Sequence, residues 1–319
     1  MLSRRQFLMS ATAAAPARLT GRQRVDRALA GADLDRPPFS FWRHFGLEKE
    51  PGERHARATL EFQRKFRTDL VKVMSDYPFP RPKGPWWETP VHANPFPQQV
   101  RALQLIRQGL GGRNYFVETI FNSWNQAEKL SSPAEVRRLM YEKPQALLDA
   151  LEAINRSQIN HARLALRAGA AGIFLAIANA DAGVLSREEY RNFSEPFDKA
   201  LLEAVRQAPL NILHLHGEQV YLDLFYKGWL ARVIHYSTHA TGIGFDQVRR
   251  SYSGVLMGGL DERHFRRLSE DQLREQWREA AQTAGRKFIL APGCSVPNDT
   301  MDEELMRLVR ALAPEARAT

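Results

Sequence analysis

Short apolar runs rich in β-branched and aromatic residues alternate with longer segments whose apolar positions recur every three or four residues. This alternation predicts strands separated by helices, and therefore βαβ units in a parallel sheet. The strand pattern occurs in eight runs: Pro38–Arg43, Leu70–Met74, Tyr115–Thr119, Gly172–Ile177, Asn211–His216, Arg232–Tyr236, Gly254–Gly258 and Lys287–Ala291. Since eight strands close a parallel barrel, the expected fold class is α/β, a single-domain (β/α)8 TIM barrel.

The segments between these runs carry helix signals. Pro144–Arg167 has apolar residues at helical spacing, and Ser186 and Ser269 are each followed three residues later by Glu or Gln, the pattern of a capping box. Pro78–Pro97 is rich in proline and tryptophan and predicts a long loop over the barrel mouth.

Composition narrows the class of protein. The chain has 319 residues and a formal net charge of +9, but its basic residues are dispersed among acidic ones, which argues against a nucleic-acid partner. No run of about 18 uncharged apolar residues exists, so no membrane span is expected. With Cys294 as the one cysteine, a disulfide within the chain is impossible.

The first residues resemble an export signal. Ser3–Leu8, which contains the pair Arg4 and Arg5, is similar to a twin-arginine signal, and an alanine-rich stretch follows it. We therefore expect residues 1–19 to be a signal or a disordered N-terminus, residues 20–319 to form the barrel, and the protein to be periplasmic or exported. The alternative is a cytoplasmic protein with a frayed N-terminus.

The fifth predicted strand suggests a metal site. His214 and His216 are two residues apart, so both side chains lie on one face of the strand, near its carboxyl end. Cys294 follows the eighth predicted strand and reaches the same end of the barrel. Two imidazoles and a thiolate leave one tetrahedral position open, as a catalytic zinc site requires. The alternative is that the histidines contact an anionic substrate and Cys294 only packs.

Several other residues are candidates for the functional site. Glu118 lies near the end of the third predicted strand and suits a ligand-orienting group or a base, with a structural carboxylate as the alternative. Lys72 and Asp76 are an even number of residues apart, so their side chains lie on the same face of an extended chain. Both can therefore face the interior or pair with each other. His235 and His239 are candidates for contacts with substrate or with the metal ligands, or for exposed loop residues.

Several segments resemble the uroporphyrinogen decarboxylase superfamily, which also contains zinc-dependent methylcobamide:thiol methyltransferases. The similar segments are Leu34–His44, Asp69–Asp76, Ala182–Ser186 with Phe193–Phe197, Met257–Asp261 and Phe288–Thr300. Their order and spacing agree with the family over nearly the whole chain after Thr20, and the resemblance implies a (β/α)8 barrel.

The resemblance to true decarboxylases implies catalytic roles for Arg43 and Asp76, which match a substrate-binding arginine and aspartate. Leu47 and Ala180 stand where a second arginine and a serine are expected, and Pro292-Gly-Cys294 replaces a Gly-His-Gly motif. A polycarboxylate substrate needs paired cations, so uroporphyrinogen is not the expected substrate.

The methyltransferase branch carries H-x-C on the fifth strand and a second cysteine after the eighth. His214 and Cys294 match this pattern, and His216 replaces the first cysteine. The resemblance implies zinc-dependent methyl or alkyl transfer to a small-molecule substrate, with a corrinoid, free or on a corrinoid protein, as the donor. The alternatives are a decarboxylase acting on a tetrapyrrole or small carboxylic acid, and an exported non-catalytic protein that binds a metal or tetrapyrrole.

Overall fold

Parallel strands form the centre of the molecule and follow one another in chain order. The computed structural model describes residues 19–312, so the predicted export signal lies outside the described residues. Within this range a sheet of seven strands has the order β1 to β7, each parallel to the next. The strands are β1 (Leu70–Val73), β2 (Tyr115–Phe121), β3 (Ile173–Ile177), β4 (Ile212–Leu215), β5 (Val233–Tyr236), β6 (Val255–Leu260) and β7 (Phe288–Pro292).

The predicted first strand, Pro38–Arg43, is the exception. It forms one parallel bridge, between Phe39 and Leu290 of β7, and the Phe39 carbonyl accepts from the Asp69 amide (2.9 Å) just before β1. The prediction of eight regular strands is thus confirmed for seven. Pro37 and Pro38 have no N–H to donate, which limits the ladder that this segment can build.

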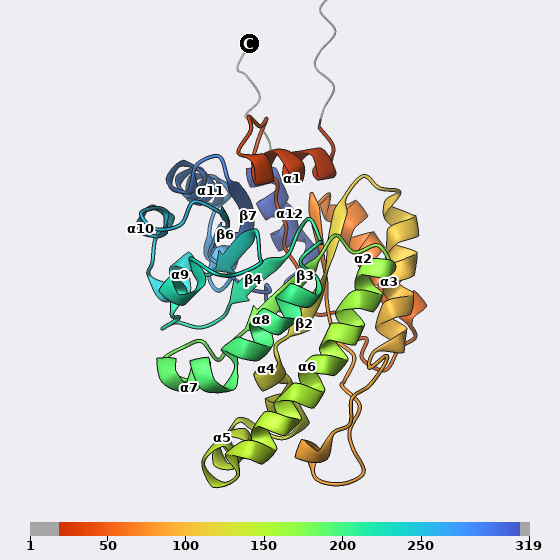
Figure 1. Ribbon diagram of the computed structural model, residues 1–319. Coiled ribbons are helices and arrows are strands. Elements are labelled where there is room, and N and C mark those ends of the chain that lie inside the picture. The colour runs from red at the N-terminus through yellow and green to blue at the C-terminus, as the bar shows by residue number, and fades with distance from the viewer. Residues whose placement is uncertain (1–18, 313–319) are drawn as a thin grey trace, which may run out of the picture.

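Helices surround the sheet (Figure 1). They include the predicted helix Pro144–Arg167, and the predicted capping boxes at Ser186 and Ser269 are both present. Within the described range the α-helices are α1 (Gly21–Ala30), α2 (Gly52–Phe66), α3 (Pro97–Leu110), α4 (Ser123–Leu130), α5 (Pro133–Glu142), α6 (Pro144–Arg167), α7 (Arg187–Phe193), α8 (Glu195–Ala204), α9 (Thr238–Thr241), α10 (Phe245–Arg249), α11 (Glu270–Ala284) and α12 (Asp302–Ala311). None of these helices has the length and apolar character needed to cross a membrane.

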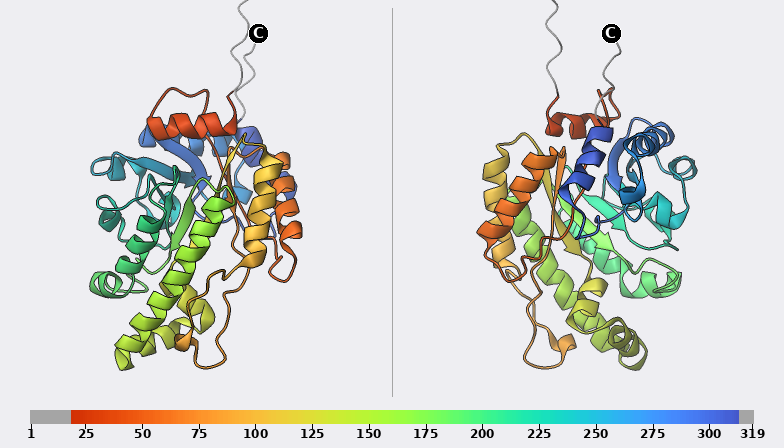
Figure 2. Two further views of the ribbon diagram at one scale, coloured as in Figure 1. Left: turned by 45° about the vertical axis from the view of Figure 1, so that its right-hand side comes forward. Right: turned by 180° about the vertical axis from the view of Figure 1, so that it is seen from behind.

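The two ends of the curled sheet differ. Helix α1 lies across the end where the strands begin, and its Val25 and Leu29 belong to the same buried cluster as Leu70 and Ile212 inside the sheet. At the other end, α4, α5 and the long segment before α3 extend beyond the strands (Figure 2). That segment includes the predicted loop Pro78–Pro97, which thus lies beside the carboxyl ends of the strands.

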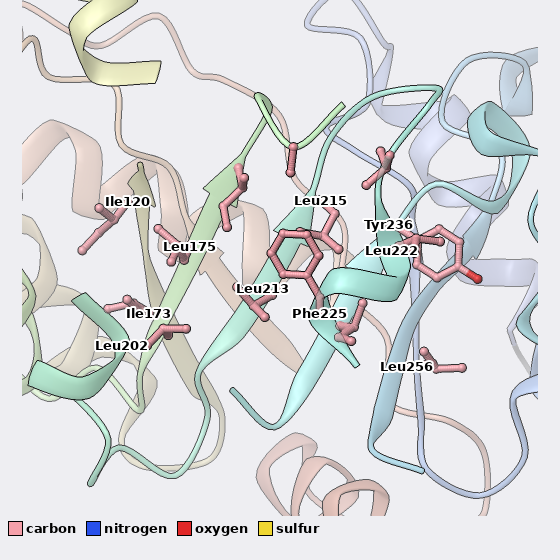
Figure 3. Packing of buried hydrophobic residues seen from close by; sticks show 14 of the residues in the cluster. Ile120, Ile173, Leu175, Leu202, Leu213, Leu215, Leu222, Phe225, Tyr236 and Leu256 are labelled. Carbon is pink, nitrogen blue, oxygen red and sulfur yellow. The ribbon is translucent and has the colours of Figure 1, made fainter. Parts of the chain in front are cut away.

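Alternation along the strands decides which side chains face the interior. Leu213 and Leu215 of β4 pack on the outer face with residues such as Leu175, Leu202 and Phe225 (Figure 3). Burying each such leucine contributes roughly 1.5–3 kcal/mol, which fixes the strand's orientation. The intervening His214 therefore faces the interior, and His216 follows on the same side.

Candidate metal centre

Strand β4 ends at the candidate site. His214 is buried, and its ring lies 5.1 Å from that of Phe174. His216 comes directly after the strand and is exposed to solvent. The structure therefore places the two predicted histidines on the same side of β4, with one held inside the sheet and the other at its open end.

Cys294 reaches the histidines from the loop after β7, which buried polar contacts hold in place. The Gly293 amide donates to Glu262 Oε2 (3.1 Å), and Ser237 Oγ donates to the same oxygen (3.0 Å). A Cβ on Gly293 would lie 2.3 Å from Cβ of Ser237, so the close approach requires glycine. Cys294 Sγ lies 3.7 Å from His214 Nε2.

Together these contacts bring the three predicted ligands to one place. One ligand atom from each of His214, His216 and Cys294 lies within 4.8 Å of the others. Two imidazoles and a thiol form a donor set that suits zinc, and the exposure of His216 leaves one side open to solvent. The geometry fits a metal ion with an open coordination position.

His235 determines which nitrogen of His214 faces Cys294. His235 Nε2 lies 2.8 Å from the carbonyl of Pro292, which only accepts, so this nitrogen carries the proton. Burial lowers the pKa of His235 to about 3, so the ring is neutral and its Nδ1 is an acceptor. That atom lies 2.8 Å from His214 Nδ1, which must donate. The lone pair of His214 is therefore on Nε2, directed to Cys294.

The surroundings shift the pKa values of all three predicted ligands. Burial opposes ionisation of the Cys294 thiol, but His216, the Ser295 amide and Lys72 favour the thiolate and lower its pKa below the ordinary value. The hydrogen bond with Cys294 raises the pKa of His216 above the ordinary value. Burial lowers the pKa of His214 well below the ordinary value. Without a metal, the thiolate and His216 thus stabilise each other's charged forms.

Arg43 does not join this group. Its guanidinium donates to the carbonyl of Thr300 (2.6 Å) and lies 3.5 Å from Asp302 at the start of α12. The neighbouring Trp42 belongs to the interior cluster, so Arg43 takes the opposite side of the chain. The structure gives Arg43 a role in anchoring α12 and does not place it beside the predicted ligands.

Asp76 lies at the end of β1 and is already engaged. His44 Nδ1 donates to its Oδ1 (2.5 Å), and the buried His55 lies 4.0 Å from Oδ2. Burial opposes ionisation, but the hydrogen bond with His44 keeps the pKa of Asp76 below its ordinary value. With its side chain 3% exposed, Asp76 is poorly placed to receive the N–H groups of a large substrate.

Glu118 lies on the outer face of β2, between the sheet and the helices. It is fully buried, and its two oxygens contact His161 Nε2 of α6 (2.9 Å) and Gln99 Nε2 of α3 (2.9 Å). This arrangement matches the structural carboxylate that the sequence left open as an alternative. It does not bring Glu118 to the predicted ligands.

One contributor to the site, Glu262, was not identified from the sequence. His235 was among the candidates for contact with the predicted ligands, and it lies against His214. A carboxylate shortly after the end of a barrel strand is a signal that could have singled out Glu262, because functional groups gather at that end. The predicted alternative of an ion pair between Lys72 and Asp76 is not found: Lys72 Nζ contacts Met74 Sδ (3.1 Å) instead.

A curled parallel sheet with polar groups at its carboxyl ends defines a TIM-barrel-like enzyme scaffold. Residues 86–313 match the family model of uroporphyrinogen decarboxylase (URO-D). The chain therefore belongs to the uroporphyrinogen decarboxylase family. This confirms the predicted superfamily, whose members include decarboxylases and methyltransferases.

Individual relatives agree with this assignment. The uroporphyrinogen decarboxylase of Nitrosococcus oceani is 25% identical over 90% of this chain and 94% of its own length. A methyltransferase from Methanosarcina mazei has a similar structure, with a TM-score of 0.77 and 18% identity over 92% of this chain and 98% of that one. A B12-independent methionine synthase from Shewanella sp. W3-18-1 follows with a TM-score of 0.54 and 11% identity, covering 87% and 91%. The two structures support the fold.

Proposed function

We propose that this protein is a zinc-dependent enzyme that transfers a methyl or alkyl group, with His214, His216 and Cys294 as the metal ligands. The observation that carries the proposal is the mutual distance of the three ligand atoms, all within 4.8 Å. When bound, zinc would supply a Lewis acid that activates a thiol or water. Likeness to the Methanosarcina mazei methyltransferase supports the reaction class. A corrinoid, free or carried by a protein, is the proposed donor.

The chain's own residues would prepare this chemistry. His235 directs the lone pair of His214, and Glu262 holds the backbone beside Cys294 through Gly293. His216 leaves the site open on the side where a small-molecule substrate enters. We also propose that the bridge between Phe39 and Leu290 represents the eighth strand of a complete (β/α)8 barrel.

Metal analysis tests the proposal. Purified wild type should hold about one equivalent of zinc. Cys294→Ser and His216→Ala should each weaken zinc binding by about 10- to 100-fold or more. His239→Ala is the matched control, because this histidine lies outside the cluster, 4.0 Å from Asp261. Wild-type protein without metal would exclude the proposed centre.

The second candidate is a decarboxylase, and the identity to the Nitrosococcus oceani enzyme favours it. Two contacts disfavour a decarboxylase, that of Arg43 with Thr300 and that of Asp76 with His44. They engage the two side chains that would bind the substrate. Loss of carboxylate from a tetrapyrrole by metal-free protein would establish this candidate. Tightly held zinc without turnover of any donor and acceptor would instead favour the non-catalytic binding protein.

Export through the twin-arginine pathway is a further proposal, based on Arg4 and Arg5. Replacing both with lysine should retain the protein in the cytoplasm, which cell fractionation measures. Equal distribution of wild type and variant would contradict export by this route.

A further inference from the structure

Lys72 is a buried cation inside the curled sheet. It lies on β1 between Leu70 and Met74, which belong to the interior cluster, and it is only 8% exposed. Its ammonium lies 5.0 Å from the centre of the Trp42 ring and 4.8 Å from that of Phe174. The aromatic faces stabilise the positive charge, yet they offer it no counter-anion.

No acidic group among the described residues contacts the Lys72 ammonium, although Cys294, Asp76 and Glu118 attract its charge from farther away. The one hydrogen-bond partner of its ammonium is Met74 Sδ, and no described carboxylate forms an ion pair with it. Burial accordingly lowers the pKa of Lys72 to about 8. An ammonium taken out of water without a counter-ion is costly, and buried charges are ordinarily paired.

Lys72 is also close enough to act on the candidate metal centre. Trp42 links the two, since its ring lies 5.0 Å from the Lys72 ammonium and 5.4 Å from the His235 ring. Phe174 contacts both sides, since its ring lies 4.8 Å from the Lys72 ammonium and 5.1 Å from the His214 ring. Lys72 thus forms part of the same interior region as the proposed ligands.

The ammonium also keeps donors without acceptors. Its three N–H groups have the weak acceptor Met74 Sδ as their one hydrogen-bond partner among the described residues. Arg43, the other cation considered for the site, is held by Thr300 and Asp302. An anion beside Lys72 would supply the missing acceptors.

We infer that Lys72 binds a carboxylate of the substrate, next to the metal centre, and so restricts the enzyme to anionic substrates. This inference rests on the proposed function, because the metal would hold the reacting atom while Lys72 holds the carboxylate. Lys72 is a specificity-determining residue in this role.

Isothermal titration calorimetry of zinc-loaded protein tests the inference. The probes are 3-mercaptopropionate and 3-mercaptopropionamide, which share the thiol and differ in the carboxylate. Wild type should bind the carboxylate about 10-fold or more tightly than the amide. Lys72→Met should reduce this preference to about 2-fold or less. Because both affinities are measured on the same variant, any change in the zinc centre affects them alike. Lys72→Arg should keep most of the preference.

The outcomes separate the two proposals. Loss of zinc from wild type would refute the metal centre itself. A zinc-loaded wild type that binds both thiols equally, or a Lys72→Met variant that keeps the full preference, would refute the role of Lys72 alone. Zinc-loaded wild type that binds neither thiol would also refute the role of Lys72, while its zinc content would leave the metal centre standing. Lys72→Gln, with its neutral polar side chain, gives the same comparison if Lys72→Met does not fold, and thermal unfolding checks each variant.

Discussion

Replacing His235 with leucine tests how the candidate metal centre is organised. His235 contacts the Pro292 carbonyl and His214 Nδ1, each at 2.8 Å, and is fully buried. Leucine fills a similar volume but neither donates nor accepts. The His214 N–H then loses its acceptor, and nothing directs the Nε2 lone pair towards Cys294.

The size of the effect follows from these two contacts. Each buried group left without a partner costs about 1–3 kcal/mol, so the free energy of unfolding should fall by about that amount per group. Removing the hydrogen-bond partner of a metal-bound histidine ordinarily weakens metal affinity about 10- to 100-fold. At about 1.4 kcal/mol per factor of ten, this loss is about 1.4–2.8 kcal/mol of binding free energy.

Competition with a chromophoric zinc chelator measures the affinity, and urea unfolding of the metal-free protein measures stability. His235→Asn keeps an oxygen near the position of Nδ1 and should recover part of the affinity. His239→Ala should behave as wild type, because it lies outside the cluster. If folded His235→Leu binds zinc within about 2-fold of wild type, the inferred orientation of His214 is wrong.

Three further predictions test the neighbouring contacts. Gly293→Ala would place a Cβ 2.3 Å from Ser237 and should weaken zinc binding by about 10-fold or more, whereas His239→Ala should not; equal affinities would contradict the tight fit. Glu118→Gln should lower the free energy of unfolding by about 1–3 kcal/mol in urea titrations and leave zinc content unchanged; loss of zinc would restore Glu118 to the site. Burial raises the pKa of Asp198 from 3.8 to about 7, so the folded state binds its proton more tightly than the unfolded state. The resulting stability is present below pH 4 and lost as pH rises to 7, by up to about 4 kcal/mol, and Asp198→Asn should remove this part of the pH dependence of urea unfolding. An unchanged pH dependence would refute that assignment.

The sequence predicted the elements that alternation and capping specify. Seven of the eight strands and the helix Pro144–Arg167 are present. The two-residue spacing of His214 and His216 correctly placed both on one side of β4, because Leu213 and Leu215 had to face the helices. Convergence of Cys294 with them followed from the rule that parallel strands end at one side of the barrel.

The remaining errors concern side-chain direction. Both faces of a parallel strand are buried, so apolar residues on either side of Glu118 do not show which face meets the helices. The direction of the Arg43 side chain depends on where the chain leaves its bridge to β7. The Asp76 carboxylate is engaged by His44, a partner from a separate loop. His235 acquired its role from the register of β4 and β5, which pairs it with His214. These facts depend on tertiary contacts that no local pattern specifies.

The three proposed ligands also differ in how firmly the fold holds them. His214 is buried and oriented by His235, and Cys294 is held through the Glu262 contact to Gly293. His216, which stands where the methyltransferase pattern has cysteine, is exposed at the end of β4. The departure from that pattern therefore falls at the ligand whose replacement disturbs packing least. Exchanging a thiolate for an imidazole there removes one negative charge, which would make a bound metal a stronger Lewis acid.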